Sequence, residues 1–285
     1  MNPFRCGRKR ASGAVAPVAP VALLLALAVS PALALASTTD VQTVDAQTAG
    51  TAETAFLAEL ERARTERART VESLAADVVV SLAAPAWEGT GTCEGRLLAR
   101  RPGALRLRGY GGLSTVFDAA TDGQRFGLYI PALGHAVLGD SGQESLLTAG
   151  LPILPGEIVR ALFGEPYGAS DQKIRVRSLT PETWVAWTLA DGHEVRARYR
   201  RNPVLIERAE LWAGDKRVAK LEYRDYRKRK GVWWPTRIEF DWPEERGKLA
   251  LEFSSVTFQV THPADAFRLV PPEGVPVVDL KGTAP

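Results

Sequence analysis

The sequence predicts a mainly β protein of the α+β class: an unclosed antiparallel β-barrel, or strongly curved sheet, with an N-terminal helix and a short helical lid. Three observations lead to this fold class. One amphipathic stretch follows an apolar leader, apolar and polar residues then alternate with a period of two, and one apolar insert interrupts that alternation. Long helices do not alternate with the strand-like runs, which is evidence against a doubly wound nucleotide-binding fold.

The first 36 residues have the features of a secretory signal peptide. A basic start without acidic residues precedes the apolar run Val21–Val29, and the small-x-small sequence Ala34–Ala36 follows. We expect cleavage after Ala36, which makes Ser37 the mature N-terminus. An uncleaved apolar segment that anchors the protein to a membrane is the alternative.

The two cysteines predict neither a lipid anchor nor an internal disulfide. Cys6 lies before the apolar run, which is not the position of an acylated lipoprotein cysteine. Cys93 is the single cysteine after residue 36, so it has no partner within the mature chain. We expect Cys93 to be a small buried residue of a strand.

The ordered domain is expected to span residues 53–280, between a linker at 37–52 and a tail at 281–285. From Thr51 to Ala76 the spacing predicts an amphipathic helix with Phe56 and Leu60 on its buried face. Glutamates interleave with four arginines, which we expect on the solvated, ion-paired face: Arg62, Arg64, Arg67 and Arg69.

Strand-like runs fill the rest of the chain. Turn signals separate five apolar runs in the first half: Val78–Leu82, Leu97–Ala99, Leu105–Leu107, Val116–Ala119 and Phe126–Ile130. Four segments of the second half alternate between apolar and charged residues, with Ala250 at one of the charged positions: Lys173–Arg177, Glu194–Arg200, Arg237–Trp242 and Lys248–Phe253. This pattern predicts a large antiparallel sheet with one charged face and one apolar face.

One apolar insert separates these two halves. Its two expected helices are Gln143–Ala149 and Pro155–Phe163. The apolar side chains of the insert cannot all face water, so we expect it to lie against the apolar side of the sheet. As a lid it would contribute these residues to a ligand site: Leu146, Leu147, Leu151, Ile153, Leu154, Ile158, Leu162 and Phe163. A core plug that never moves is the alternative.

Motifs for catalysis, metals or cofactors do not emerge from the sequence. The three histidines lack metal-ligand spacing: His135, His193 and His262. No G-x-S-x-G motif is present, and the candidate acid–base carboxylates are expected at loop edges: Asp118, Asp122 and Asp140. We therefore expect a protein that is not an enzyme, with no catalytic residue, no cofactor and no metal.

The charge distribution argues against nucleic-acid binding. After residue 36 the chain holds 32 basic and 33 acidic residues. The strongest local feature is the basic segment 224–230, followed by Trp233 and Trp234. It fits docking on anionic lipid head groups, but we favour a charged hairpin loop with Gly231 at its turn and the tryptophans packed on the sheet.

Several stretches in one order resemble the LolA/LolB-type family of lipoprotein carriers and receptors of Gram-negative bacteria, most closely its LolB branch. They are Leu105–Arg108, Gly112–Thr115, Asp122–Phe126, Gly150–Pro155 and Leu162–Pro166. The resemblance covers roughly Thr54–Leu280. It implies an unclosed β-barrel around a helical lid, an apolar cavity for acyl chains, and a periplasmic location with possible membrane association.

Within this resemblance, Leu113 corresponds to the exposed leucine on a strand-connecting loop with which the LolB receptor delivers lipoproteins into the outer membrane. The sequence departs from the family in two respects: Tyr110–Gly112 replaces a Pro-containing approach, and the lipid-attachment motif of the receptor is missing. The missing motif favours a soluble carrier or a divergent relative.

The resemblance implies a protein that binds the acyl chains of a lipoprotein, or another amphiphile, for lipoprotein transport or outer-membrane localisation. Its expected partners are those acyl chains or another lipid, with transient contact to the outer or inner membrane, and we expect a monomer. One alternative is a sensory or interaction domain of the same fold in envelope homeostasis. A weaker one is a hydrolase.

Overall fold

The computed structural model describes residues 46–83, 90–140, 155–168, 174–179, 182–242 and 247–280. The strands of the first half are β1 (Ser73–Ala83), β2 (Thr90–Arg100), β3 (Ala104–Gly111), β4 (Ser114–Thr121), β5 (Arg125–Ile130) and β6 (His135–Asp140). Those of the second half are β7 (Arg175–Ser178), β8 (Glu182–Thr188), β9 (Glu194–Arg200), β10 (Leu205–Ala213), β11 (Lys216–Arg229), β12 (Val232–Trp242), β13 (Gly247–Phe258) and β14 (Val277–Leu280). Each of the nine strand runs expected from the sequence overlaps one of these strands, and Lys173 lies outside the described residues.

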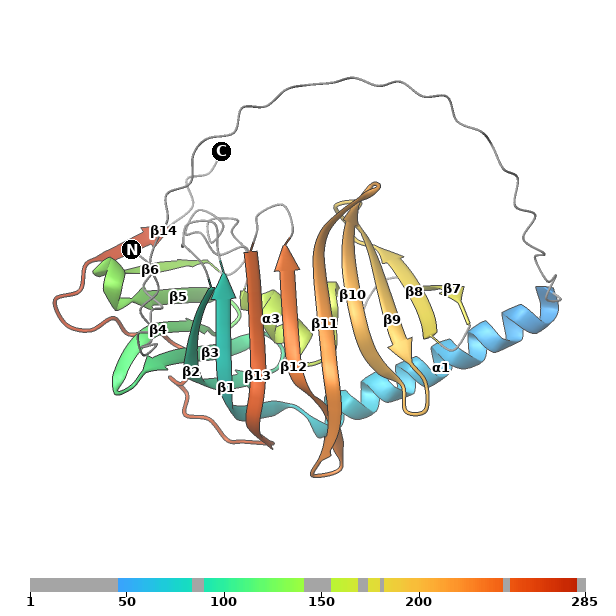
Figure 1. Cartoon of the computed structure of the whole chain (residues 1–285), viewed down its shortest axis with the longest axis horizontal. Helices are drawn as coiled ribbons and strands as arrows, with labels where there is room; N and C mark the ends of the chain where they lie inside the picture. The colour runs from blue at the N-terminus through green and yellow to red at the C-terminus, as the bar shows by residue number, and fades with distance from the viewer. Residues whose placement is uncertain are drawn as a thin grey trace, which may run out of the picture.

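Within the described residues the fourteen strands form one sheet, in the order β14-β6-β5-β4-β3-β2-β1-β13-β12-β11-β10-β9-β8-β7. Neighbouring strands are antiparallel, except that β14 runs parallel to β6. No pairing joins the edge strands β14 and β7 across these residues, so the sheet curves without closing (Figure 1). This architecture confirms the predicted fold class.

Helix α1 (Ala46–Thr70) differs at both ends from the helix expected over residues 51–76. It begins inside the span assigned to the linker, and it ends before Val71. Beyond that point the backbone bonds to the sheet instead, because Leu74 pairs with both Phe258 of β13 and Ala99 of β2. The apolar pattern through residue 76 thus combines a helix with the start of a strand.

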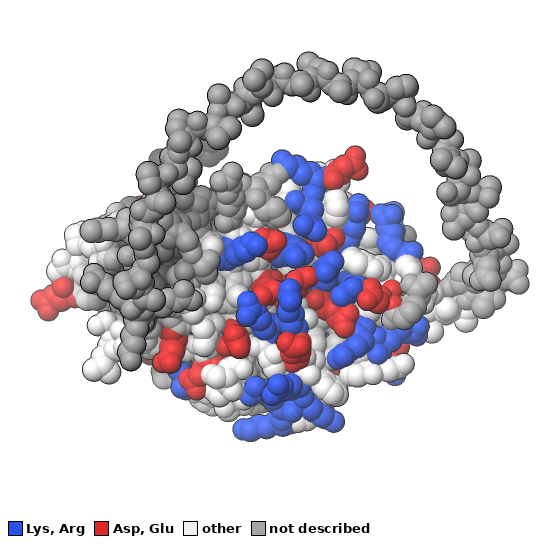
Figure 2. Space-filling model, viewed as in Figure 1, with Lys and Arg blue, Asp and Glu red and all other residues white. Residues whose placement is uncertain are grey.

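The two faces of the sheet have opposite character, as predicted. Alternate residues of β12 and β13 point inward and are buried: Ile238, Phe240, Trp242, Leu249, Leu251 and Phe253. Charged side chains on the outer face form ion pairs between adjacent strands, such as Arg208 of β10 with Glu222 of β11 at 2.8 Å and Arg224 of β11 with Glu239 of β12 at 2.9 Å. Figure 2 shows the resulting mixture of positive and negative side chains over this half of the sheet.

Asp118 joins two strands to the C-terminal segment. Its carboxylate accepts hydrogen bonds from Arg106 at 2.8 Å and Arg108 at 2.7 Å, and Arg106 also donates to the carbonyl oxygen of Ala266 at 3.2 Å. The expectation that Asp118 lies at a loop edge is wrong, because it lies inside β4 and only 6% of it is exposed. The segment near Ala266 covers Asp118, although the alternation of side chains along β4 by itself predicts that Asp118 faces solvent.

The Asp118 cluster gives a pH-dependent prediction. Burial alone raises the pKa of Asp118, but the hydrogen bonds and charges of Arg106 and Arg108 outweigh it and hold the pKa below its ordinary value. The carboxylate therefore stabilises the fold above its unfolded pKa of about 3.9, and this contribution is lost as pH falls through the lower folded pKa. Asp118→Asn should lower the free energy of unfolding by about 1–3 kcal/mol at pH 7.

Urea unfolding between about pH 7 and about pH 3 measures both effects. Below about pH 4 the wild type should lose stability more steeply than the variant. The matched control is Asp140→Asn, since Asp140 is exposed and lies 3.9 Å from Arg125; it should change stability by less than about 0.5 kcal/mol. Equal losses in the two variants would contradict the role of Asp118.

Candidate functional site

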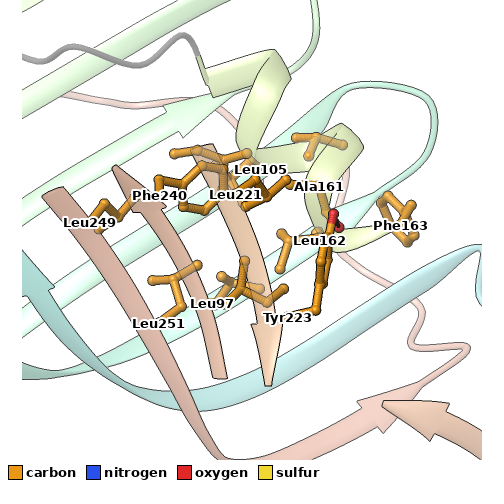
Figure 3. Packing of buried hydrophobic residues seen from close by; sticks show 14 of the residues in the cluster. Leu97, Leu105, Ala161, Leu162, Phe163, Leu221, Tyr223, Phe240, Leu249 and Leu251 are labelled. Carbon is orange, nitrogen blue, oxygen red and sulfur yellow. Dashed lines mark hydrogen bonds between the residues drawn. The ribbon is translucent and has the colours of Figure 1, made fainter. Parts of the chain in front are cut away.

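Helix α3 (Pro155–Leu162) lies on the concave, apolar side of the sheet (Figure 1). Its inward side chains Ile158 and Leu162 are 8% and 0% exposed, and Phe163, which directly follows the helix, is 2% exposed. Figure 3 shows the end of α3 beside leucines and aromatic side chains of the strands, among them Leu105, Leu221 and Phe240. These contacts place the described part of α3 in the hydrophobic core.

The structure therefore describes three of the eight residues assigned to the lid, namely Ile158, Leu162 and Phe163. The other five lie outside the described residues: Leu146, Leu147, Leu151, Ile153 and Leu154. The expected helix Gln143–Ala149 lies outside them as well. The expected helix Pro155–Phe163 agrees with α3, which ends at Leu162, two residues before Gly164 with its φ of 76°.

Side chains from α1 and the sheet satisfy the last carbonyl groups of α3. Arg67 of α1 donates from Nε to the carbonyl oxygen of Phe163 at 3.1 Å and from Nη2 to that of Leu162 at 3.4 Å. The hydroxyl of Tyr223 on β11 donates to the carbonyl oxygen of Ala161 at 3.0 Å. A helix leaves these carbonyls without partners of its own, and its C-terminal end favours a cation.

The same guanidinium also reaches the sheet. Arg67 donates from Nη1 to the carbonyl oxygen of Trp233 at 3.1 Å, and its Cζ lies 5.0 Å from the centre of the Trp234 ring. Burial lowers the pKa of Arg67, but an arginine is not deprotonated in proteins. Arg67 thus connects α1, α3 and β12 as a permanent cation.

Arg101, in the turn between β2 and β3, supports this arrangement from the other side. Its guanidinium lies 2.6 Å from the Glu165 carboxylate, donates to the carbonyl oxygens of Val71 and Phe163, and stacks over the Phe163 ring at 4.5 Å. The C-terminal end of α3 is consequently held by two arginines and one tyrosine.

Our expectation that all four arginines of α1 face solvent is wrong for Arg67. A signal for its burial was present in the sequence. Phe56, Leu60 and Arg67 follow the spacing i, i+4 and i+11, which places them on one face of a helix. Arg64 forms the expected pair with Glu61 at 3.7 Å, but only 13% of the Arg64 side chain is exposed, so the expectation of a solvent-facing side chain is wrong for Arg64 as well.

Four tyrosines line the interior near these helices: Tyr167, Tyr199, Tyr223 and Tyr226. Burial raises the pKa of Tyr199 to about 12 and raises the pKa values of the other three as well. All four phenols are therefore neutral at physiological pH. They provide hydrogen-bond donors without adding charge, as when Tyr226 donates to the carbonyl oxygen of Ile206 at 2.6 Å.

Two neighbouring turns, at the same end of strands β3 to β6, expose leucines. Leu113, in the turn between β3 and β4, is fully exposed, and Gly112 before it has a φ of 64°. Leu133, in the 3-10 turn η1 (Pro131–Leu133), is 52% exposed, and η1 contacts β4. We call Leu113 and Leu133 the apolar rim.

The histidines are held at separate places. His135 Nδ1 lies 2.9 Å from the carbonyl oxygen of Leu133, His193 lies 2.9 Å from Asp191, and the His262 ring packs against Phe267. Across the described ranges, no three His, Cys, Asp or Glu residues form a group that could hold a metal ion. Among the helices that the structure describes, none is long and apolar enough to cross a membrane.

No protein-family model and no curated protein matches this chain. Solved structures do match it. A DUF1329 family protein from Desulfovibrio piger is similar with a TM-score of 0.54 and 13% identity, over 72% of this chain and 93% of that one. A LolA superfamily protein from Nitrosomonas europaea is similar with a TM-score of 0.50 and 16% identity, over 72% of this chain and 96% of that one.

The chain is therefore a half-barrel protein of LolA-like fold, with one large unclosed sheet and helices against its concave side. This confirms the fold that the sequence resemblance implied. At these identities the comparisons establish the fold alone, and they do not single out the LolB branch.

The contacts of Arg67 give a prediction for stability. Arg67→Met keeps much of the side-chain volume but leaves the carbonyls of Leu162, Phe163 and Trp233 without this donor. The free energy of unfolding should fall by about 2–4 kcal/mol, measured by chemical denaturation. The control Arg69→Met, at an exposed position of the same helix, should stay within about 0.5 kcal/mol of the wild type. Similar stabilities for the two variants would show that Arg67 does not anchor α3.

Proposed function

We propose that this chain is a periplasmic protein that binds the acyl chains of a lipoprotein, or another amphiphile, inside the half-barrel. We assign it to lipoprotein transport or outer-membrane localisation, as a monomer, without covalent chemistry. The observation that carries the proposal is a continuous apolar concave face on an unclosed sheet, with α3 held against it at the helix C-terminal end.

This geometry suits a hydrocarbon ligand for two physical reasons. Each methylene group moved from water into an apolar interior gains about 0.8 kcal/mol. The described edge strands β7 and β14 are not paired with each other, so the half-barrel can widen without breaking a strand ladder between them. Neutral tyrosines near α3 keep this interior uncharged, because Tyr223 and Tyr226 donate to the carbonyl oxygens of Ala161 and Ile206 without adding a charge.

We assign the acyl-chain site to the lid, with Ile158, Leu162 and Phe163 at its base. The remaining contacts in this proposal come from Leu146, Leu147, Leu151, Ile153 and Leu154. Mass spectrometry of an organic extract of the purified mature protein tests the proposal directly. An acyl lipid in molar proportion to the protein is expected, and an extract without one after purification in detergent-free buffer would count against it.

The apolar rim is the part of the proposal that concerns delivery. A fully exposed Leu113 forgoes about 1.5–3 kcal/mol of burial, which is consistent with a contact to membrane or cargo. Leu133 on the adjoining turn extends the same exposed surface. We propose that Leu113 is used as in the LolB receptor, to release cargo into a membrane.

A first prediction separates a lid from a core plug. Leu151→Asp or Leu154→Asp should abolish binding of a fluorescent fatty acid while circular dichroism and the melting temperature stay close to those of the wild type. Leu162→Asp is the matched comparison, because Leu162 is fully buried and the substitution should unfold the protein. Global unfolding of the Leu151 or Leu154 variant would support the plug.

A second prediction concerns Leu113. Leu113→Glu should leave the melting temperature nearly unchanged, since the side chain is exposed, but should abolish transfer of bound lipid or lipoprotein to liposomes. The control Val270→Glu places the same charge at another exposed apolar position, 74% exposed, and should transfer normally. A clear loss of stability with transfer intact would exclude this role of Leu113.

A further inference from the structure

A second surface with a distinct chemistry lies at the tip of the β11–β12 hairpin. The segment 224–230 holds five basic residues, and the chain reverses at Lys230 and Gly231, which have φ values of 48° and 86°. This confirms the expected hairpin with Gly231 at its turn. Trp234 is fully buried against Phe253, as expected, whereas Trp233 is only partly buried.

The five basic residues of this hairpin fall into two groups. Arg224 pairs with Glu222 at 2.7 Å, and Arg229 donates to the carbonyl oxygens of Phe253 and Ser254. The other three are exposed and form no salt bridge with the described residues: Arg227, Lys228 and Lys230. We call these three the cationic tip.

The cationic tip contrasts with the rest of the outer face, where cations and anions alternate. Figure 2 shows a positive cluster at the lower edge of the molecule, where the β11–β12 hairpin ends in Figure 1. Beside it lies a surface hollow of about 620 Å³, lined in part by Arg227, Arg229, Thr236 and Ser254. Two carboxylates also border it, Asp225 and Glu252, of which Glu252 lies 3.6 Å from Arg237.

We propose that the cationic tip docks the protein on the anionic head groups of a phospholipid membrane. Unpaired lysines and arginines are attracted to such a surface through the solvent, by about 1 kcal/mol each. Trp233 lies directly opposite Lys228 in the hairpin and is partly exposed, and tryptophan is enriched at the level of lipid head groups.

An acidic protein partner fits these observations less well. A stable protein interface needs about 800 Å² from each partner and an apolar or aromatic centre. The large exposed apolar residues among those described are Leu113, Leu133, Val270, Val277 and Val278, and none lies on this hairpin. A narrow tip with charge and one partly buried tryptophan matches a layer of head groups.

Docking by this tip is distinct from the proposed delivery by the apolar rim. In this antiparallel sheet, the turn between β11 and β12 lies at one end of the strands. The turns that carry Leu113 and Leu133 lie at the opposite strand ends. The cationic tip and the apolar rim are therefore separate surfaces of the protein. The docking requires neither a bound acyl chain nor Leu113.

Sedimentation with phospholipid vesicles tests the inference with the mature protein. Vesicles of phosphatidylglycerol and phosphatidylcholine should bind it, vesicles of phosphatidylcholine alone should not, and binding should weaken between about 0.05 M and about 0.5 M NaCl. The triple variant Arg227→Gln, Lys228→Gln, Lys230→Gln should bind roughly 100-fold more weakly. The single variant Lys228→Gln should lose roughly 5-fold, which keeps the test valid if the triple variant misfolds.

The matched control removes three exposed cations that each face a carboxylate: Arg96→Gln, Arg125→Gln and Lys248→Gln. It changes the net charge equally and should bind vesicles within a few-fold of the wild type. Leu113→Glu should also bind normally, and the triple variant should still bind the fluorescent fatty acid, so failure of docking and failure of cargo binding are distinguishable. Equal losses in the triple variant and the control, or equal binding to both kinds of vesicle, would overturn the proposal.

Discussion

The position of the helices in this half-barrel depends on the guanidinium of Arg67. An open sheet with one apolar face needs a cover, but hydrophobic contact has no direction and does not by itself fix where a helix ends. Arg67 supplies that direction, because it donates to carbonyl oxygens of Leu162, Phe163 and Trp233 while its plane lies over Trp234. Three segments distant in sequence are thereby held at one point.

This anchoring has a consequence for how the interior is reached. The C-terminal end of α3 is held by hydrogen bonds from Arg67, Arg101 and Tyr223, and its buried residues pack as core. Any movement that admits a ligand therefore leaves residues 161–163 in place. Among the described residues, the edge strands β7 and β14 lack such anchoring to each other.

The outer face of the sheet is exposed to water and is covered with ion pairs. A large curved sheet exposes many side chains to water, and interleaved ion pairs such as Arg224 with Glu239 keep this surface polar without a strong net field. Departures from that pattern stand out for this reason. Leu113 and Leu133 are exposed apolar side chains at one end of the strands. The cationic tip, at the other end, has cations without paired carboxylates among the described residues.

The sequence by itself determined the mainly β class, the strand runs, the two-faced sheet and the short helix at Pro155, because periods of two and 3.6 residues are local properties. It also pointed to Leu113 through a local resemblance. Only the tertiary structure decided that α1 ends before Val71, that Asp118 is buried under the C-terminal segment, and that Arg67 turns inward. Those three outcomes depend on partners more than 90 residues away, Arg67 with Phe163 being one of them, and a local pattern carries no information about such partners.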